Sequence, residues 1–219
     1  MKVLMPLRTI LLAALLLIAA LPLTGLSISG TEWEGGIRWI GVSSDQSADY
    51  QSDVLTNELI FRLPLTVSER LEVVPSLALN MLYYERNSEG RVVPVDMEVR
   101  EMTALVPIVE LPLRWRFLRF QSHSYSFSGG IAAELPIPVG FAEPAATEEI
   151  IKGLYSDLRF VLPFARLSGR WTIGGRFHLV GRTVGYFPVH RLWDGSGAPF
   201  SDHLMVGFSV GLFFPRSTD

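Results

Sequence analysis

The sequence predicts an all-β fold, specifically an eight-stranded antiparallel up-and-down transmembrane β-barrel. Three observations indicate this fold. Beyond about residue 30, apolar and polar residues alternate over most of the chain, and a period of two is typical of a strand with one apolar face. The connections between the alternating segments are short and long in turn. No later run approaches the roughly 18 uninterrupted apolar residues that a membrane helix needs.

The first three strands come from the clearest alternation in the chain. One is expected at about 32–43, where neighbours such as Trp33 and Glu34 belong to opposite faces. Two more are expected in the stretch "ELIFRLPLTVSERLEVVPSLALNMLYY", residues 58–84, where the short polar segment "TVSER" divides two alternating runs. A hairpin is therefore predicted here.

The fourth and fifth strands carry the same pattern. The fourth is expected at about 103–116, with Leu, Val and Trp side chains on the face opposite Glu110. The fifth is expected at about 124–139, where large apolar residues such as Phe127 alternate with small ones such as Ser128. Each strand thus has one bulky face and one small or charged face.

The last three strands are read in the same way. The sixth is expected at about 153–164, with its leucines and phenylalanines opposite Asp157 and Arg159. The seventh is expected at about 170–182, and the eighth runs from Leu204 to the end of the apolar alternation.

Short and long connections alternate between these strands. The short ones are expected near 67–70, 117–123 and 165–169, and the long ones near 44–54, 85–101, 140–152 and 183–202. Tight turns at one end and long loops at the other are the layout of an outer-membrane barrel.

The apolar face could point inward, as in a soluble barrel of the lipocalin type, or outward to lipid. The interior of an eight-stranded barrel is only wide enough for side chains or one small ligand, and the apolar face would place on the order of 40 large residues there. The opposite face holds small residues, namely Gly36, Ser76, Ala78, Ser126, Ser128, Gly130, Ala132 and Gly174. We therefore expect the small face inside and the apolar face against lipid, where an exposed apolar belt is stable.

Aromatic residues gather near the predicted short turns. They are Trp33, Trp115, Phe117, Phe120, Tyr125, Phe164, Trp171 and Phe214. Amphipathic rings prefer the level of the lipid headgroups, so this set predicts one girdle of an aromatic belt.

The N-terminus predicts export. Lys2 and Arg8 precede the apolar run "TILLAALLLIAALPL", and small and polar residues follow it, which is typical of a signal peptide. Residues 1–29 are expected to be removed, with cleavage after Ser29 or alternatively after Gly25, leaving 30–219 as the barrel domain. Removal of the two basic residues changes the net charge from −3 to about −5. With no cysteine, no disulfide holds the exported fold.

Charged residues on the polar face predict a lumen of matched ion pairs. The predicted network consists of Glu34, Arg38, Glu58, Arg62, Glu72, Glu110, Arg114, Glu134, Asp157, Arg159, Arg176 and Arg182. A buried charge without a partner is very costly, so acids and bases in so narrow a lumen are expected to pair. Two interpretations remain: a polar core that blocks passage, or a narrow pore gated by exchange of partners.

The stretch "IVELPLRWRFLRFQSHSYSFSGGIAAEL", residues 108–135, resembles the small outer-membrane β-barrel domain families of the OmpA, OmpX and OmpW kind. In them a strand with a Pro-apolar step, here Pro112 and Leu113, runs through a short periplasmic turn into a strand with glycines, here Gly129 and Gly130. The resemblance implies an eight-stranded membrane domain with lipids and the barrel-assembly machinery as partners. An OmpW-like protein would be a narrow channel for small or apolar solutes.

The last strand, "HLMVGFSVGLFF", resembles the C-terminal signal that barrel-assembly machinery reads. The resemblance assigns the signal to Phe208, Val210, Leu212 and Phe214. The chain departs from the usual pattern because "PRSTD" follows where an aromatic residue normally ends the chain.

No pattern predicts an enzyme or a cofactor. His123 and His178 form no recognisable triad, and the spacing of His190, Asp194, Asp202 and His203 matches no standard metal site. The weak net charge argues against nucleic acid as a partner. The long loops are either contact sites for an extracellular partner or simply exposed. The expected function is that of an outer-membrane barrel with a structural or surface-interaction role, or alternatively that of a narrow channel.

Overall fold

The computed structural model describes residues 26–41, 53–86, 92–141, 144–156, 159–173, 177–188 and 204–216. The predicted signal peptide lies almost entirely outside these residues and stays a prediction. No helix among the described residues is long and apolar enough to cross a membrane.

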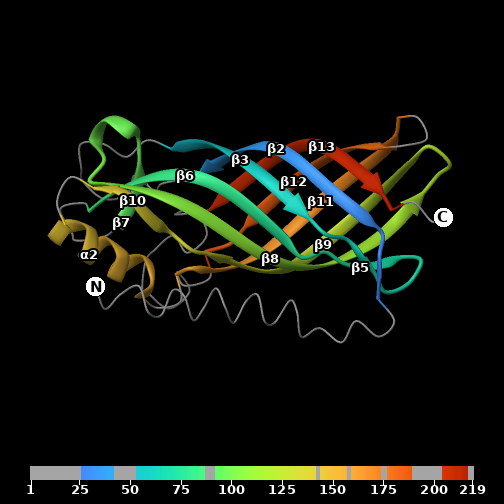
Figure 1. Ribbon diagram of the computed structural model, residues 1–219, viewed down its shortest axis with the longest axis horizontal. Helices are drawn as coiled ribbons and strands as arrows, with labels where there is room; N and C mark the ends of the chain where they lie inside the picture. Colours follow the sequence, from blue (N-terminus) through green and yellow to red (C-terminus); the bar gives the residue numbers. More distant parts are fainter. Residues whose placement is uncertain are drawn as a thin grey trace.

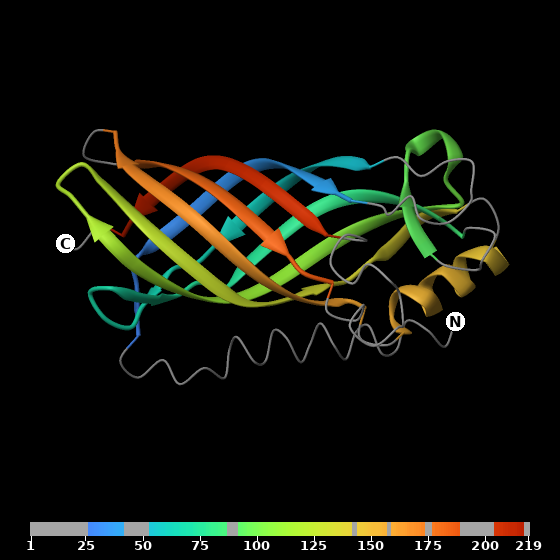
Figure 2. The same cartoon turned by 180° about the vertical axis from the view of Figure 1, so that it is seen from behind.

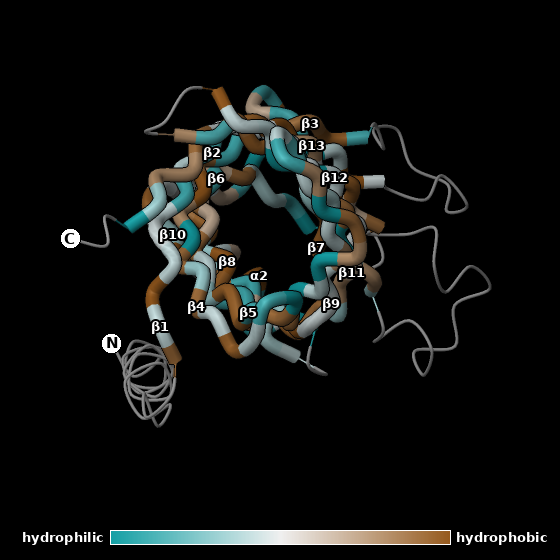
Figure 3. The backbone as a smooth tube through the Cα atoms, turned by 90° about the vertical axis from the view of Figure 1, so that its right-hand side faces the viewer, coloured by the Kyte–Doolittle hydropathy of each residue, from teal (hydrophilic) through white to brown (hydrophobic). Residues whose placement is uncertain are grey.

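Eight long strands close into a barrel, as the sequence predicted (Figures 1 and 2). They are β2 (Gly30–Ile40), β3 (Val54–Arg62), β6 (Ser76–Arg86), β8 (Met102–Arg119), β9 (His123–Glu134), β11 (Val161–Thr172), β12 (His178–Tyr186) and β13 (Met205–Pro215). Each pairs antiparallel with the next in the chain, and β13 pairs with β2 to close the ring (Figure 3). Closure leaves no exposed sheet edge among these strands.

Shorter elements extend both ends of the barrel. At the end with the tight turns, hereafter the short-turn end, lie β1 (Ser27–Ile28), β4 (Leu65–Thr66) and β5 (Leu71–Val73). At the opposite end, the loop end, lie β7 (Val92–Val95), η1 (Met97–Val99), β10 (Ile137–Phe141) and α2 (Pro144–Leu154). The last described residue, Arg216, lies at the short-turn end, where its backbone N–H donates to the Ser29 carbonyl over 2.9 Å.

The seam between β2 and β13 depends on a glycine. Gly30 opens β2 with φ +155°, a conformation that L side chains rarely adopt. A Cβ at this position would lie 2.1 Å from the backbone oxygen of Phe214. The first and last barrel strands can therefore approach closely here only because residue 30 has no side chain.

The sixth predicted strand is wrong in position and in facing. Residues 144–154 form α2, and the strand β11 begins only at Val161. Ile150, Ile151 and Leu154 of this helix have the spacing of one helix face, and the side chain of Ile150 is fully buried. The adjoining tight turn consequently lies between β11 and β12, after Thr172, rather than at 165–169.

The outer face of the barrel is apolar, as expected. Side chains of alternate residues on every long strand point outward, and Leu55, Ile131 and Val210 are 65%, 61% and 60% exposed. Trp33, Trp115 and Trp171 are also exposed near the short-turn end, in agreement with an aromatic girdle. Phe164 is a correction to that set, because it is buried in the lumen with only 4% exposure.

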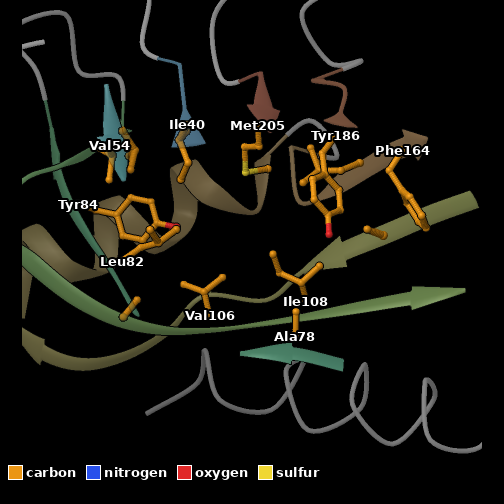
Figure 4. Packing of buried hydrophobic residues seen from close by; sticks show 14 of the residues in the cluster. Ile40, Val54, Ala78, Leu82, Tyr84, Val106, Ile108, Phe164, Tyr186 and Met205 are labelled. Carbon is orange, nitrogen blue, oxygen red and sulfur yellow. The ribbon is translucent and has the colours of Figure 1, made fainter. Parts of the chain in front are cut away.

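The interior has two layers. The layer toward the short-turn end is polar and charged, whereas the layer toward the loop end is an apolar cluster (Figure 4). The apolar cluster includes Ile40, Val54, Ile60, Leu82, Tyr84, Met102, Val106, Ile108, Leu162, Phe164, Tyr186 and Met205. Predicted small residues such as Ser76, Ala78 and Ser128 do lie inside, but large apolar side chains also pack in the loop-end half of the lumen, which the sequence did not predict.

Candidate functional site

The charged layer of the lumen is the candidate functional site. Alternation places even-numbered residues of β2, β3, β8, β11 and β12 inside, so a sequence such as "EWEGGIR" in β2 sends its acids and its arginine inward. These side chains come from strands on opposite walls and meet across the interior. A barrel of this width lets long Arg and Glu side chains span the lumen.

Glu110 of β8 is the centre of this layer. Its Oε1 accepts from Arg166 Nη2 over 2.6 Å and from the Tyr186 hydroxyl. Its Oε2 accepts from Arg62 Nη1 over 2.7 Å and from Ser76 Oγ over 2.5 Å. One carboxylate thereby ties β8 to β3, β6, β11 and β12, and it is 1% exposed. Charge-assisted hydrogen bonds of this kind are stronger than neutral ones.

A second set joins β2 to β3, β12 and β13. Glu34 Oε1 accepts from Arg62 Nε over 2.9 Å and also from Arg182, while its Oε2 accepts from Ser209 Oγ over 2.7 Å. Arg38 donates to Glu58, and its guanidinium carbon lies 4.7 Å from the ring centre of Tyr186. Every charged member of this set has a partner of opposite sign, as a dry lumen requires.

A third set lies nearest the short-turn end. Arg114 donates to both oxygens of Glu32, over 3.0 and 3.1 Å, and to Glu72 Oε2 over 3.1 Å. Arg170 donates to Glu32 Oε1 over 2.7 Å, and Arg116 donates to Glu72 Oε1 over 2.8 Å. Arg182 reaches Glu32 as well. At this end, two carboxylates therefore form ion pairs with four guanidinium groups.

The structure brings eight of the twelve predicted lumen residues into this charged layer: Glu34, Arg38, Glu58, Arg62, Glu72, Glu110, Arg114 and Arg182. Glu134 and Arg159 lie at the loop end instead, beside the apolar cluster. Asp157 and Arg176 lie outside the described residues.

Sequence reasoning missed four charged members of the layer, although each follows the alternation of its strand. Glu32 has the same parity as Glu34 and would have been found by following the alternation to the start of the strand. Arg166 was hidden because a turn was predicted at 165–169, although "RLSGRW" alternates with the correct period, whereas Arg170 lies at the start of the predicted seventh strand with the parity of Arg182 and was overlooked. Arg116 follows Arg114 on the same face of β8 and was overlooked.

A cavity of about 70 Å³ lies above the charged layer, at the loop end of the lumen. Apolar side chains from β2, β6, α2, β11 and β13, among them Leu82, Leu154 and Leu162, form most of its wall. Glu134 and Arg159 add the charged groups. Nearby, burial and the charge of Glu134 raise the pKa of Tyr155 to about 12, so its hydroxyl stays protonated and donates to the Pro136 carbonyl over 3.2 Å.

The residues assigned to the assembly signal all lie on the outward face of β13. Phe208, Val210 and Phe214 are exposed there, and Leu212 shares their parity. Their role in assembly stays a prediction.

The histidines occupy less informative places. His123 stacks on Phe120 with ring centres 4.4 Å apart, and His178 Nδ1 lies 3.0 Å from Thr172 Oγ1. The loop set with His190 and His203 falls outside the described residues, and within them no three His, Cys, Asp or Glu side chains form a group that could hold a metal ion.

A closed antiparallel barrel with an apolar outer belt and a charged interior is the architecture of a small outer-membrane β-barrel. This is the class that the resemblance in the sequence implied. The orientation of the barrel in the membrane and its role depend on the structure of its two ends and on the side chains that fill its lumen.

Comparison with solved structures finds barrels of the same class. OprG of Pseudomonas aeruginosa aligns at 7% identity over 88% of this chain and 98% of that one, with a TM-score of 0.45. Ail of Yersinia pestis aligns at 8% identity over 87% and 100% of the two chains, with a TM-score of 0.41. AlkL, solved in lipid bilayers, aligns at 11% identity over 88% and 94%, with a TM-score of 0.39. No family model and no curated protein matches the sequence.

Proposed function

We propose that the protein is a closed outer-membrane barrel that does not conduct ions and that acts through its loop end at the cell surface. In this proposal the short-turn end faces the periplasm and the loop end faces outward, as in barrels with tight turns on one side and long loops on the other. The observation that carries the proposal is the continuous filling of the described lumen, by charged groups at one end and by the apolar cluster at the other.

The charged layer opposes passage because its bonds cross the lumen. Glu110 links four neighbouring or opposite strands, and Glu32 links three arginines, so an ion could pass only if several bonds opened together. Attraction between opposite charges is strong where water is scarce. The apolar cluster then adds a second barrier that offers no ligands to an ion.

Planar-bilayer recording of the purified protein tests this proposal. The unmodified protein should show no stable current. Glu58→Gln should raise the frequency of opening because it removes the carboxylate that pairs with Arg38, and Arg114→Gln should do so because it removes the bonds to Glu32 and Glu72 that cross the lumen. Glu98→Gln, in η1 at the loop end, changes the same type of side chain outside the lumen and should stay silent. A stable, large, ion-selective current in the unmodified protein would overturn the proposal.

Exposed apolar residues at the loop end favour a surface contact. Met97 and Val99 of η1 are 55% and 36% exposed, although they lie beyond the lipid-facing strands. We propose that these two side chains take part in the contact with a partner. We propose no catalytic activity, in keeping with the sequence, in which the histidines form no recognisable triad motif.

A second candidate is a site for a small apolar solute, and the cavity of about 70 Å³ at the loop end favours it. Its wall is mainly apolar, so a small apolar molecule would replace no well-bound water there. Xenon is a suitable probe. Its NMR shift should respond to the protein, and Leu162→Phe, which fills the cavity, should abolish the response. Leu167→Phe, on the same strand but facing lipid, is the matched control. An unchanged response in Leu162→Phe would contradict this candidate.

A further inference from the structure

The charges of the lumen balance in one region and not in another. In the middle of the barrel, Arg38, Arg62 and Arg166 face Glu34, Glu58 and Glu110, which is three bases to three acids. Toward the short-turn end, Arg114, Arg116, Arg170 and Arg182 face Glu32 and Glu72, which is four bases to two acids, although Arg182 also pairs with Glu34 of the middle region. These lumen residues therefore carry an excess of two positive charges, and the arginines responsible gather toward the short-turn end.

A small cavity lies at that place. It has a volume of about 10 Å³, and all four of these arginines line it together with serines of β9 and β11. A cavity needs roughly 10–15 Å³ of such volume to hold one water molecule, so the space fits a single small particle. The side chains of Arg116 and Arg170 are 18% and 17% exposed, which opens a path from the short-turn end.

Three buried donors beside this cavity have no hydrogen-bond partner among the residues that the structure describes. They are Arg114 Nε, Arg182 Nε and Ser168 Oγ. Their residues are 3%, 5% and 8% exposed, so bulk water does not satisfy them. An unsatisfied buried donor costs on the order of 1–3 kcal/mol, and native proteins rarely leave several together.

The lining favours an anion over water. Both carboxylate oxygens of Glu72, the acid in the lining, already accept from Arg114 and Arg116. The unpartnered Nε–H groups of Arg114 and Arg182 can only donate, and the Ser168 hydroxyl can donate as well, so a ligand here has to accept from all three. A monatomic anion accepts from every side and also compensates the excess positive charge.

We propose that this cavity binds a small monatomic anion, chloride being the obvious one, held by Arg114, Arg182 and Ser168. The bound anion completes the charge balance of the lumen and locks β8, β11 and β12 together near the short-turn end. The site is separate from the loop end, so it does not depend on the surface role proposed above.

Urea-induced unfolding of the full barrel in detergent tests the site, since urea adds no halide. The midpoint should rise with sodium chloride and not with sodium gluconate at equal ionic strength. Ser168→Ala removes one donor to a charged ligand and should raise the chloride concentration for half-maximal stabilisation about tenfold. Ser128→Ala is the matched control, because Ser128 Oγ is equally buried and unpartnered but does not line the cavity.

A second measurement locates the ion even if a variant folds poorly. Crystals of the unmodified protein in sodium bromide should give an anomalous peak inside the cavity between Arg114, Arg182 and Ser168. Equal stabilisation by chloride and gluconate together with no bromide peak would overturn the proposal. A shift in Ser128→Ala as large as in Ser168→Ala would overturn the assignment of the chloride effect to this cavity.

Discussion

At the scale of single residues, Glu110 has the largest set of partners in the lumen. It lies on β8 and accepts from Arg62, Arg166, Ser76 and Tyr186, which belong to four different strands. Removal of its charge would leave Arg166 without the carboxylate that both of its short bonds reach. Breaking a buried pair by removing one partner is costly because the other charge stays buried.

Glu110→Gln should therefore destabilise the folded barrel by about 3–5 kcal/mol in reversible urea unfolding from lipid vesicles. The side chain keeps its size, so the loss reports charge rather than packing. The double variant Glu110→Gln with Arg166→Gln should lose less than the sum of the two single variants, since both charges are then absent. Glu98→Gln, outside the lumen, should stay within about 0.5 kcal/mol of the unmodified protein. A small effect of Glu110→Gln would show that the network contributes little to stability.

At the scale of elements, β13 has two tasks. It closes the barrel against β2 over its whole length, from Met205 opposite Ile40 to Pro215 opposite Gly30. It also presents a continuous apolar outer face that ends at Phe214. The two residues after Phe214 also contact the start of the barrel: Pro215 pairs with Gly30 of β2, and the backbone N–H of Arg216 donates to the Ser29 carbonyl.

Phe214→Ala should lower the amount of protein inserted in the outer membrane, because it removes the last aromatic residue of the predicted assembly signal. Phe127→Ala is the matched control, since Phe127 on β9 is 44% exposed to lipid against 42% for Phe214. Both variants lose a similar lipid contact, so only a role in assembly separates them. Equal yields of the two in membrane fractions would contradict the prediction.

Truncation refines the same prediction. Removal of residues 217–219 keeps Pro215 and Arg216 and should leave insertion unchanged. Removal of all of "PRSTD" also removes the contacts of Pro215 and Arg216 with the start of β2. The longer truncation should therefore weaken the seam between β2 and β13, and quantification of membrane-inserted protein distinguishes the two.

At the scale of the whole molecule, the outer belt and the closed ring act together. Exposed side chains such as Leu59, Leu113 and Phe208 would form an apolar surface far larger than soluble monomers tolerate. In a bilayer the same surface is solvated by lipid, while closure satisfies the backbone groups of the strands.

The folded protein should consequently migrate differently on a gel before and after heating, because a closed barrel resists unfolding by detergent at room temperature. Protease added to intact cells should cut the protein only in the long connections at the loop end. Full recovery in the soluble fraction after folding without detergent would contradict the transmembrane fold.

The sequence by itself determined the class of fold, the lipid-facing residues and much of the charged layer. These properties are local. In a strand with a period of two, the positions of Leu59, Phe61 and Arg62 already determine on which face of the strand each side chain lies. The same logic placed Glu34, Arg38 and Glu58 inside before any neighbour was known. It failed at "EEIIKGLYSDLRF", where leucine and isoleucine spacing suits both a helix and a strand, and that error hid Arg166.

Only the tertiary structure decided how the inside is filled. Residues 102–109, "MTALVPIV", are apolar on nearly every position, so no alternation shows that Met102, Val106 and Ile108 pack in the lumen. The partners of each arginine likewise depend on ring closure, which brings Glu32 of β2 against Arg114 of β8, 82 residues away. Such contacts are set by strand tilt and stagger around the whole ring, and these are properties of the closed barrel rather than of any segment.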